Sequence, residues 1–103
     1  MKTTSRAAAA MIVALTVACV TKPTTPLREI ALPDLSTAEP AVRDQLNAGY
    51  HTLTSKKNDA NAYGEMGKLL LAAEFLEAAE PCLLNAQTLA PGDARWPYYL
   101  GHL

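Results

Sequence analysis

Two glycines, Gly67 and Gly101, lie 34 positions apart, and each directly follows a large apolar residue, Met66 or Leu100. A fixed period of about 20 to 50 residues is typical of stacked supersecondary units, and a period of 34 residues fits a unit of two helices joined by a turn. The sequence therefore predicts an all-α fold of antiparallel helix-turn-helix repeats.

The residues around and after Gly67 extend this pattern. The matching positions are Tyr63, Met66, Gly67, Leu70, Ala79, Leu83, Ala86 and Pro91. Their spacing is similar to the W-x2-L-G-x2-Y, A-x3-F and P blocks of the tetratricopeptide repeat family, with Leu83 in place of an aromatic residue. The resemblance implies one repeat over residues 60–93 and a second, truncated repeat over residues 94–103 that contains Leu100 and Gly101. Trp96 stands one place before the position that the family's aromatic residue prefers.

Small and large residues are placed as two closely packed helices require. We expect Gly67 and Ala79 to lie where the helix backbones approach, with bulkier side chains such as Leu83 filling the gaps around them. A glycine inside a helix costs about 1 kcal/mol relative to alanine. Packing is therefore the preferred explanation of Gly67, and a helix that is simply weakened is the alternative.

A leading helix is predicted over residues 35–57, before the repeat. Ser36 and Glu39 have the S-x-x-E spacing of a capping box, and Pro40 falls in the first turn, where its missing N–H does no harm. We expect this helix to cover the apolar face of the first repeat, because the terminal units of a repeat array need a polar outer face.

The repeat itself is predicted to contain helices over residues 59–73, with Asn58 or Asp59 as the cap, and 76–89. Asp93 is expected to cap a further helix. The aromatic and apolar residues of that last helix would lack a following helix to cover them. These residues are Trp96, Tyr98, Tyr99 and Leu100. Because each repeat contacts only its neighbours and about three are needed for stability, we expect further repeats after Leu103. The alternative is that this open end packs on a partner.

The first 19 residues are predicted to be a signal peptide. Lys2 and Arg6 precede an apolar run, Ala7 to Ala18, that ends in small residues, as in secretory signals. The run is shorter than the roughly 20 apolar residues that a transmembrane helix needs. A cytosolic N-terminal helix and an uncleaved anchor are the alternatives.

Residues 15–19 resemble a bacterial lipobox, in which a small residue precedes a cysteine that is lipidated. Cys19 would be the lipidated residue, although Thr16 stands where the lipobox prefers leucine. The resemblance implies a periplasmic protein anchored to a membrane, and Val20 after the cysteine resembles lipoproteins sent to the outer membrane. An ordinary cleaved signal that releases a soluble periplasmic protein is the alternative.

Residues 20–34 are rich in Thr and Pro, and their prolines, Pro23, Pro26 and Pro33, disfavour a regular helix. We expect this segment to be an extended tether between the membrane and the folded part. The apolar interval from Leu27 to Leu32 leaves open that the segment packs back on the domain.

Nothing in the sequence predicts an enzyme, a cofactor or a metal. His51 and His102 are isolated, and Cys82 has no Cys or His at ligand spacing, so it is expected to be a buried core residue. The acidic residues of the predicted helices are expected to lie on a solvent-exposed helix surface. A formal net charge of −1 gives no reason to expect a nucleic-acid partner.

The resemblance implies a protein–protein interaction scaffold that binds a protein or peptide on a concave surface lined by the first helix of each repeat. The expected partner-binding residues are Asn61, Tyr63, Glu65, Lys68, Arg95 and Tyr99. The alternative hypothesis is that these helices are the N-terminal region of a longer envelope enzyme or assembly subunit. Sequence beyond Leu103 would distinguish the two, because more 34-residue units favour a scaffold.

Overall fold

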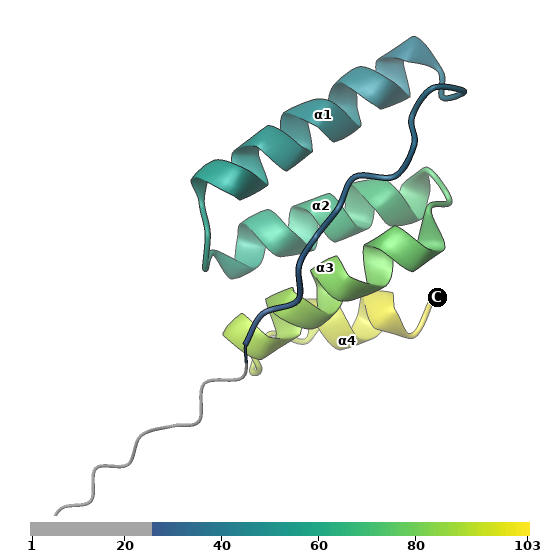
Figure 1. Cartoon of the computed structure of the whole chain (residues 1–103). Coiled ribbons are helices and arrows are strands. Elements are labelled where there is room, and N and C mark those ends of the chain that lie inside the picture. Colours follow the sequence, from purple (N-terminus) through teal and green to yellow (C-terminus); the bar gives the residue numbers. More distant parts are fainter. Residues whose placement is uncertain (1–25) are drawn as a thin grey trace, which may run out of the picture.

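The computed structural model describes residues 26–103, and these residues form four α-helices and no β-strand. The helices are α1 (Pro40–Ser55), α2 (Ala60–Ala72), α3 (Leu76–Leu89) and α4 (Arg95–Leu100). Successive helices lie side by side and run in opposite directions (Figure 1). The predicted all-α fold is confirmed for this part of the chain. The predicted signal segment and Cys19 lie outside the described residues.

The start of α1 corrects one prediction. Glu39 is the N-cap residue, and its side chain makes no capping hydrogen bond. Ser36 lies in the preceding turn, where its backbone N–H donates to Oδ1 of Asp34 at 2.9 Å. The predicted capping box of Ser36 and Glu39 is therefore not formed. The residue before a proline is pushed toward extended geometry, and Glu39 has it (φ −61°, ψ 146°), so the helix begins at Pro40.

The two central helices have nearly the predicted bounds. Asp59 caps α2, and its carboxylate accepts from the backbone N–H groups of Asn61 and Ala62 at 2.9 and 3.3 Å. Such a cap satisfies two of the free N–H groups of the first turn. α3 contains Pro81 six positions after its N-cap residue Phe75, and the helix continues through it.

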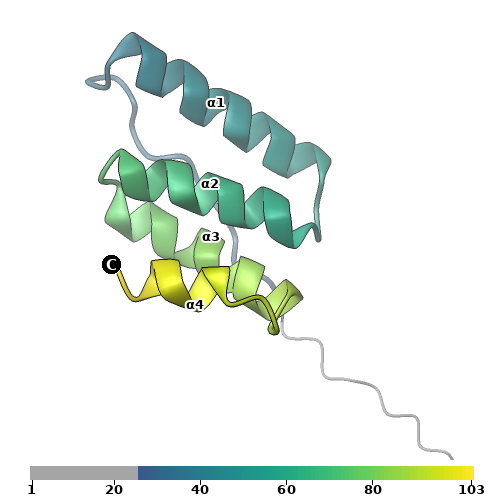
Figure 2. The same ribbon diagram turned by 180° about the vertical axis from the view of Figure 1, so that it is seen from behind.

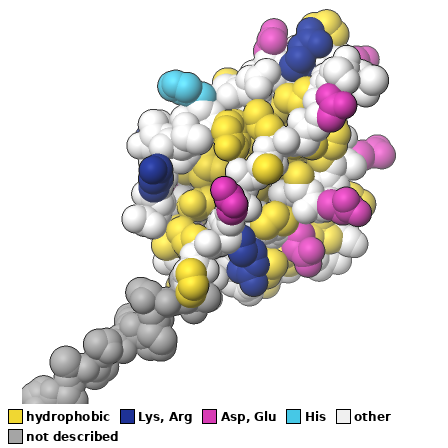
Figure 3. Space-filling view, in the orientation of Figure 1, with side chains coloured by type: hydrophobic (Ala, Val, Ile, Leu, Met, Phe, Trp, Pro, Cys, Tyr) yellow, Lys and Arg dark blue, Asp and Glu magenta, His cyan; other side chains and the backbone are white. Residues whose placement is uncertain are grey.

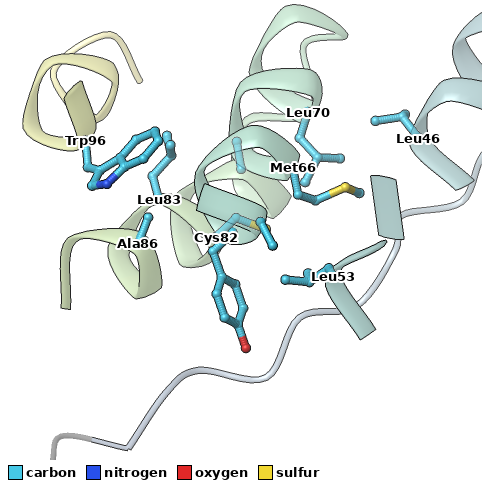
Figure 4. Close-up of a cluster of buried hydrophobic side chains, with 11 residues drawn as sticks. Leu46, Leu53, Met66, Leu70, Cys82, Leu83, Ala86 and Trp96 are labelled. Atoms are coloured by element: carbon cyan, nitrogen blue, oxygen red, sulfur yellow. The ribbon is translucent and has the colours of Figure 1, made fainter. Parts of the chain in front are cut away.

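The core lies where α1, α2 and α3 meet, with Trp96 of α4 at its far side (Figure 4). α1 contributes Leu46 and Leu53, in agreement with the expected covering role of the leading helix. Seven of the predicted repeat-packing residues are buried in α2 and α3. These are Tyr63, Met66, Gly67, Leu70, Ala79, Leu83 and Ala86.

Three other predicted packing residues are not buried. Leu100 is half-buried, whereas Pro91 and Gly101 are exposed. Pro91 lies in the turn between α3 and α4, and Gly101 caps the end of α4. Both residues therefore lie outside the core formed by residues 26–103, and their packing against a following repeat stays a prediction.

Gly67 does allow a close approach of α2 and α3, but its neighbours differ from the expected one. A Cβ atom at Gly67 would lie 2.7 Å from Cγ of Leu83 and 3.3 Å from Cβ of Cys82. Both side chains are fully buried. The atoms nearest to Gly67 thus belong to the middle of α3, and Ala79, the expected partner, is buried in the same core.

Trp96 is fully buried, which corrects the expectation that it would be uncovered. Its ring occupies the space over Gly64 of α2, and a Cβ atom at Gly64 would overlap the ring. The missing side chain of Gly64 therefore leaves room for the indole of Trp96, which stands one place before the family's aromatic position. Tyr98 remains 61% exposed, while Tyr99 and Leu100 are half-buried.

The segment of residues 27–35, here called the strap, runs across the molecule between α1 and α3 (Figure 1). Its apolar side chains pack against the core; they are Leu27, Ile30, Leu32 and Leu35. The backbone of Arg28 is held by Asn85 of α3, and that of Ile30 by Tyr50 of α1. The tether prediction is therefore wrong for residues 27–34. The alternative, that the segment packs back on the domain, is correct. Burial of its apolar side chains lowers the free energy relative to leaving them in water.

Candidate functional site

Five of the six predicted partner-binding residues lie together on one side of α2 and α4. The link between the helices is Arg95, whose Nη2 donates to Oδ1 of Asn61 at 2.9 Å. We call this area the α2–α4 surface; it consists of Asn61, Glu65, Lys68, Arg95 and Tyr99. Three of the five side chains are exposed, and Lys68 and Tyr99 are half-buried.

Lys68 contacts residues of both helices in the middle of this surface. Its Nζ lies 3.1 Å from Oε2 of Glu65, one turn earlier in α2. The same ammonium group lies 5.6 Å from the ring centroid of Tyr99 in α4, within cation–π range. An exposed ion pair contributes little to stability. These contacts therefore mainly fix the orientation of the side chains, and they leave charge and aromatic surface available to a ligand.

Arg95 is positioned by Asp93, a residue that sequence analysis considered only as a helix cap. Nε and Nη2 of Arg95 donate to the two carboxylate oxygens, the shortest bond being 2.7 Å. Hydrogen bonds from the Arg95 side chain and backbone hold the pKa of Asp93 below its usual value. The guanidinium carbon also lies 4.4 Å from the ring of Trp96, so Arg95 covers the buried indole.

Tyr63 does not belong to this surface. It is 9% exposed, and it lines a hollow on the strap side together with Tyr50 and Leu53. The structure thus separates Tyr63 from the surface that the other five predicted residues share, and its role in partner binding stays a prediction. The same residue was also predicted to pack within the repeat, and its burial agrees with that role.

A groove of about 280 Å³ lies beside the α2–α4 surface, between α1 and α2. Its apolar lining is Gly49, Ala62, Met66 and Leu69, and its polar lining is Thr52, Lys56, Asp59, Asn61 and Glu65. Asn61 and Glu65 thus belong to both the groove and the surface. A concave site that combines apolar contacts with polar groups is typical of a ligand-binding groove.

Sequence analysis missed Gly49, which brings α1 close to α2 at this groove. A Cβ atom at Gly49 would lie 3.0 Å from Cδ1 of Leu69 and from Sδ of Met66. The available signal was an isolated glycine inside the predicted leading helix. Such a glycine indicates a close helix contact.

Comparisons with known proteins found no matching family model, no matching curated protein and no matching solved structure. Within residues 26–103, no helix has the length and apolar character needed to cross a bilayer. The same residues contain no group of three His, Cys, Asp or Glu side chains that could hold a metal ion.

Cys82 is unsuited to nucleophilic chemistry. Its side chain is fully buried, and burial raises the pKa of the thiol to about 12. The thiolate is the reactive form of cysteine, so the folded protein keeps Cys82 in an unreactive state near neutral pH. The burial agrees with the core role expected from the sequence.

Proposed function

We propose that this chain is a protein–protein interaction scaffold of the tetratricopeptide-repeat kind, and that it binds a polypeptide segment on the α2–α4 surface. The observation that carries the proposal is the hydrogen bond between Arg95 and Asn61, which joins α4 to α2 beside an apolar groove. Support also comes from the positions of Glu65, Lys68 and Tyr99 on the same side.

The chemistry of this surface suits a polypeptide. Two cations, Lys68 and Arg95, lie beside two anions, Glu65 and Asp93, so the surface offers both signs of charge rather than a basic patch for a polyanion. The amide of Asn61 can pair with a main-chain group, and Tyr99 offers a rigid aromatic contact. A peptide lying over these side chains would place one apolar side chain in the groove between α1 and α2.

Binding can be tested with random peptides displayed on phage and selected against the full chain. The decisive variant is Lys68→Glu, because it reverses the charge at the centre of the surface. Lys57→Glu is the matched control, since Lys57 lines the hollow on the strap side. We expect selected peptides to bind wild type and Lys57→Glu alike and to bind Lys68→Glu about tenfold or more weakly, a loss of about 1.4 kcal/mol. Equal binding to all three would contradict the proposal.

We also propose export across the inner membrane of a bacterium and lipidation at Cys19, with outer-membrane attachment. The support is the basic and apolar pattern of residues 1–18 and the lipobox resemblance of residues 15–19. The test is the intact mass of the chain made in a bacterial host, with Cys19→Ala as the control. A mature chain that begins at Cys19 with acyl groups is expected, and a cleaved chain without acyl groups would contradict lipidation.

A further inference from the structure

A hollow of about 500 Å³ lies on the strap side of the molecule, where the end of α1 meets the start of α2. Its volume falls within the range of small-molecule sites in proteins, about 300–1,000 Å³. Residues of the strap, of α1, of the following loop and of α2 line it, and none belongs to the α2–α4 surface. In Figure 2 α4 lies in front of α2 and α3, whereas the strap passes behind them.

The strap wall of this hollow is held by two helices. Nδ2 of the fully buried Asn85 in α3 donates to the carbonyl oxygen of Arg28, and its Oδ1 accepts from the N–H of the same residue, both at 2.8 Å. The hydroxyl of Tyr50 in α1 donates to the carbonyl oxygen of Ile30 at 3.3 Å. The wall is therefore formed before any ligand arrives, as is usual for small-molecule sites.

The opposite wall comes from the tight loop between α1 and α2. The backbone N–H of Asp59 donates to the carbonyl oxygen of Lys56 at 3.3 Å. Asn58 has φ 68°, in the left-handed region that asparagine tolerates better than most residues. This loop places Lys57 on the hollow, whereas the preceding Lys56 lines the groove between α1 and α2.

Tyr63 contributes a free hydroxyl to the hollow. The residue is only 9% exposed, and its hydroxyl has no hydrogen-bond partner among the described residues. An enclosed hydroxyl without a partner would be costly. Within residues 26–103, however, Nε1 of Trp96 is the only enclosed side-chain nitrogen or oxygen that lacks a partner. The hydroxyl of Tyr63 therefore opens to the hollow that this residue lines, and it can donate to a ligand there.

The charged residues of the lining are two cations and one acid. Arg28 and Lys57 are the cations and Glu29 is the acid, and all three are exposed. The described residues contain two ion pairs, and neither involves any of these three side chains. Figure 3 shows the strap face, on which apolar side chains gather over the middle and charged side chains lie around them. A ligand with one negative charge and an apolar body complements this lining.

We propose that the hollow binds a small monocarboxylate with an aromatic body. The carboxylate accepts a hydrogen bond from the hydroxyl of Tyr63 and is attracted by Arg28 and Lys57 at the rim. The aromatic body packs against Tyr50 and Ile30, which also line the hollow. The site goes beyond the polypeptide binding proposed above, because the two sites share no residue.

The probe is benzoate, titrated into the ¹⁵N-labelled full chain and followed by amide chemical shifts. Acetate has the carboxylate without the ring, and benzyl alcohol has the ring without the charge. Benzoate should shift the amides of the lining residues and bind about tenfold or more tightly than either of the other two molecules. Its affinity should also fall as salt is added. Equal binding of benzyl alcohol or of acetate, or shifts that avoid the hollow, would overturn the proposal.

Four variants test the roles of the side chains. Tyr63→Phe removes a hydroxyl without a described partner, so it should keep the wild-type stability in urea but weaken benzoate binding about tenfold. Lys57→Gln should weaken it about threefold, and Glu29→Gln should tighten it by a similar factor. Arg43→Gln is the control, since Arg43 belongs to α1 but does not line the hollow, and it should bind benzoate as wild type does.

The Glu29→Gln variant separates ligand binding from damage to the fold, because a damaged fold would not bind more tightly. Unchanged benzoate affinity in Tyr63→Phe would overturn the proposal, and so would unchanged or weaker binding in Glu29→Gln. An equal loss of affinity in Lys57→Gln and Arg43→Gln would also overturn it, because the effect would then follow the net charge of the chain rather than the hollow.

Discussion

Arg95 donates a hydrogen bond from Nη2 to Oδ1 of Asn61, a residue that lies 34 positions earlier in the chain. Arg95 is the first residue of α4 and Asn61 is the second of α2, and their spacing of 34 makes them equivalent positions of the predicted repeat period. The bond aligns the two helices whose exposed sides form the α2–α4 surface. Asp93 also accepts hydrogen bonds from the guanidinium, and the two partners together hold Arg95 beside Asn61, which lines the groove between α1 and α2.

The two glycines that define the period should respond differently to alanine. Gly67→Ala would bring Cβ to 2.7 Å from the buried Leu83, and overpacking of this kind costs about 1–3 kcal/mol. Alanine also has a helix propensity about 1 kcal/mol more favourable than glycine, but this gain is smaller than the upper part of the overpacking cost. At Gly101 the nearest atoms would lie at 3.5 Å, an ordinary contact. Urea unfolding should show a lower stability for Gly67→Ala and a change within about 0.5 kcal/mol for Gly101→Ala. Equal effects would contradict the packing.

Gly64 and Trp96 should be energetically coupled. Gly64→Ala would place Cβ against the rigid indole, and we expect a loss of about 1–3 kcal/mol in the free energy of unfolding. In a Trp96→Leu background the ring is gone, so the same change should cost little. A double-mutant cycle measured by urea unfolding gives the coupling energy. Additive effects would show that the indole does not occupy the space over Gly64.

Regular periodicity and local capping made the helices predictable. Asp59, the apolar period of α2 and α3, and the Gly67 spacing gave bounds close to those observed, because these signals are local in sequence. Trp96 was harder, since its burial depends on the missing side chain of Gly64, 32 positions away. No local pattern reports such a pairing.

The strap was misjudged for a similar reason. The prolines correctly indicated that this segment is not a helix. Whether it extends into solvent or packs on the domain depends, however, on residues far away in the sequence that contact it in the fold. One of these residues is Asn85, whose polar side chain among the apolar positions of α3 was the available signal. In the same way, the five residues of the α2–α4 surface followed from the repeat resemblance, whereas Gly49 and the groove required the packing of α1 on α2.

Asp93 should show a pH dependence set by Arg95. The hydrogen bonds from Arg95 lower the pKa of Asp93 from the usual 3.8. A lowered carboxyl pKa in the folded state gives stability that is present above pH 3.8 and is lost as the pH falls through the folded-state pKa. An NMR titration of the Asp93 carboxyl should give a pKa below 3.8 in wild type. The Arg95→Gln variant should raise it toward the usual value, although the backbone N–H of residue 95 still donates to Asp93, and an unchanged pKa would contradict the side-chain contact.

Cys82 should be unreactive in the folded chain. Its thiol has a pKa raised to about 12 by burial, against the usual 9.0, and little thiolate exists at pH 8. A Cys19→Ser variant leaves Cys82 as the sole thiol. Ellman's reagent should then react slowly with the native protein and rapidly in denaturant. Rapid reaction of the native protein would show that the core around Cys82 opens readily.

The central claim is that the α2–α4 surface binds a polypeptide, and amide chemical-shift mapping of the labelled full chain with a phage-selected peptide tests it most directly. We expect the shifts to be concentrated at Asn61, Glu65, Lys68, Arg95 and Tyr99 and along the groove between α1 and α2. Shifts spread evenly over the chain, or absent from these residues when the peptide is saturating, would contradict the claim.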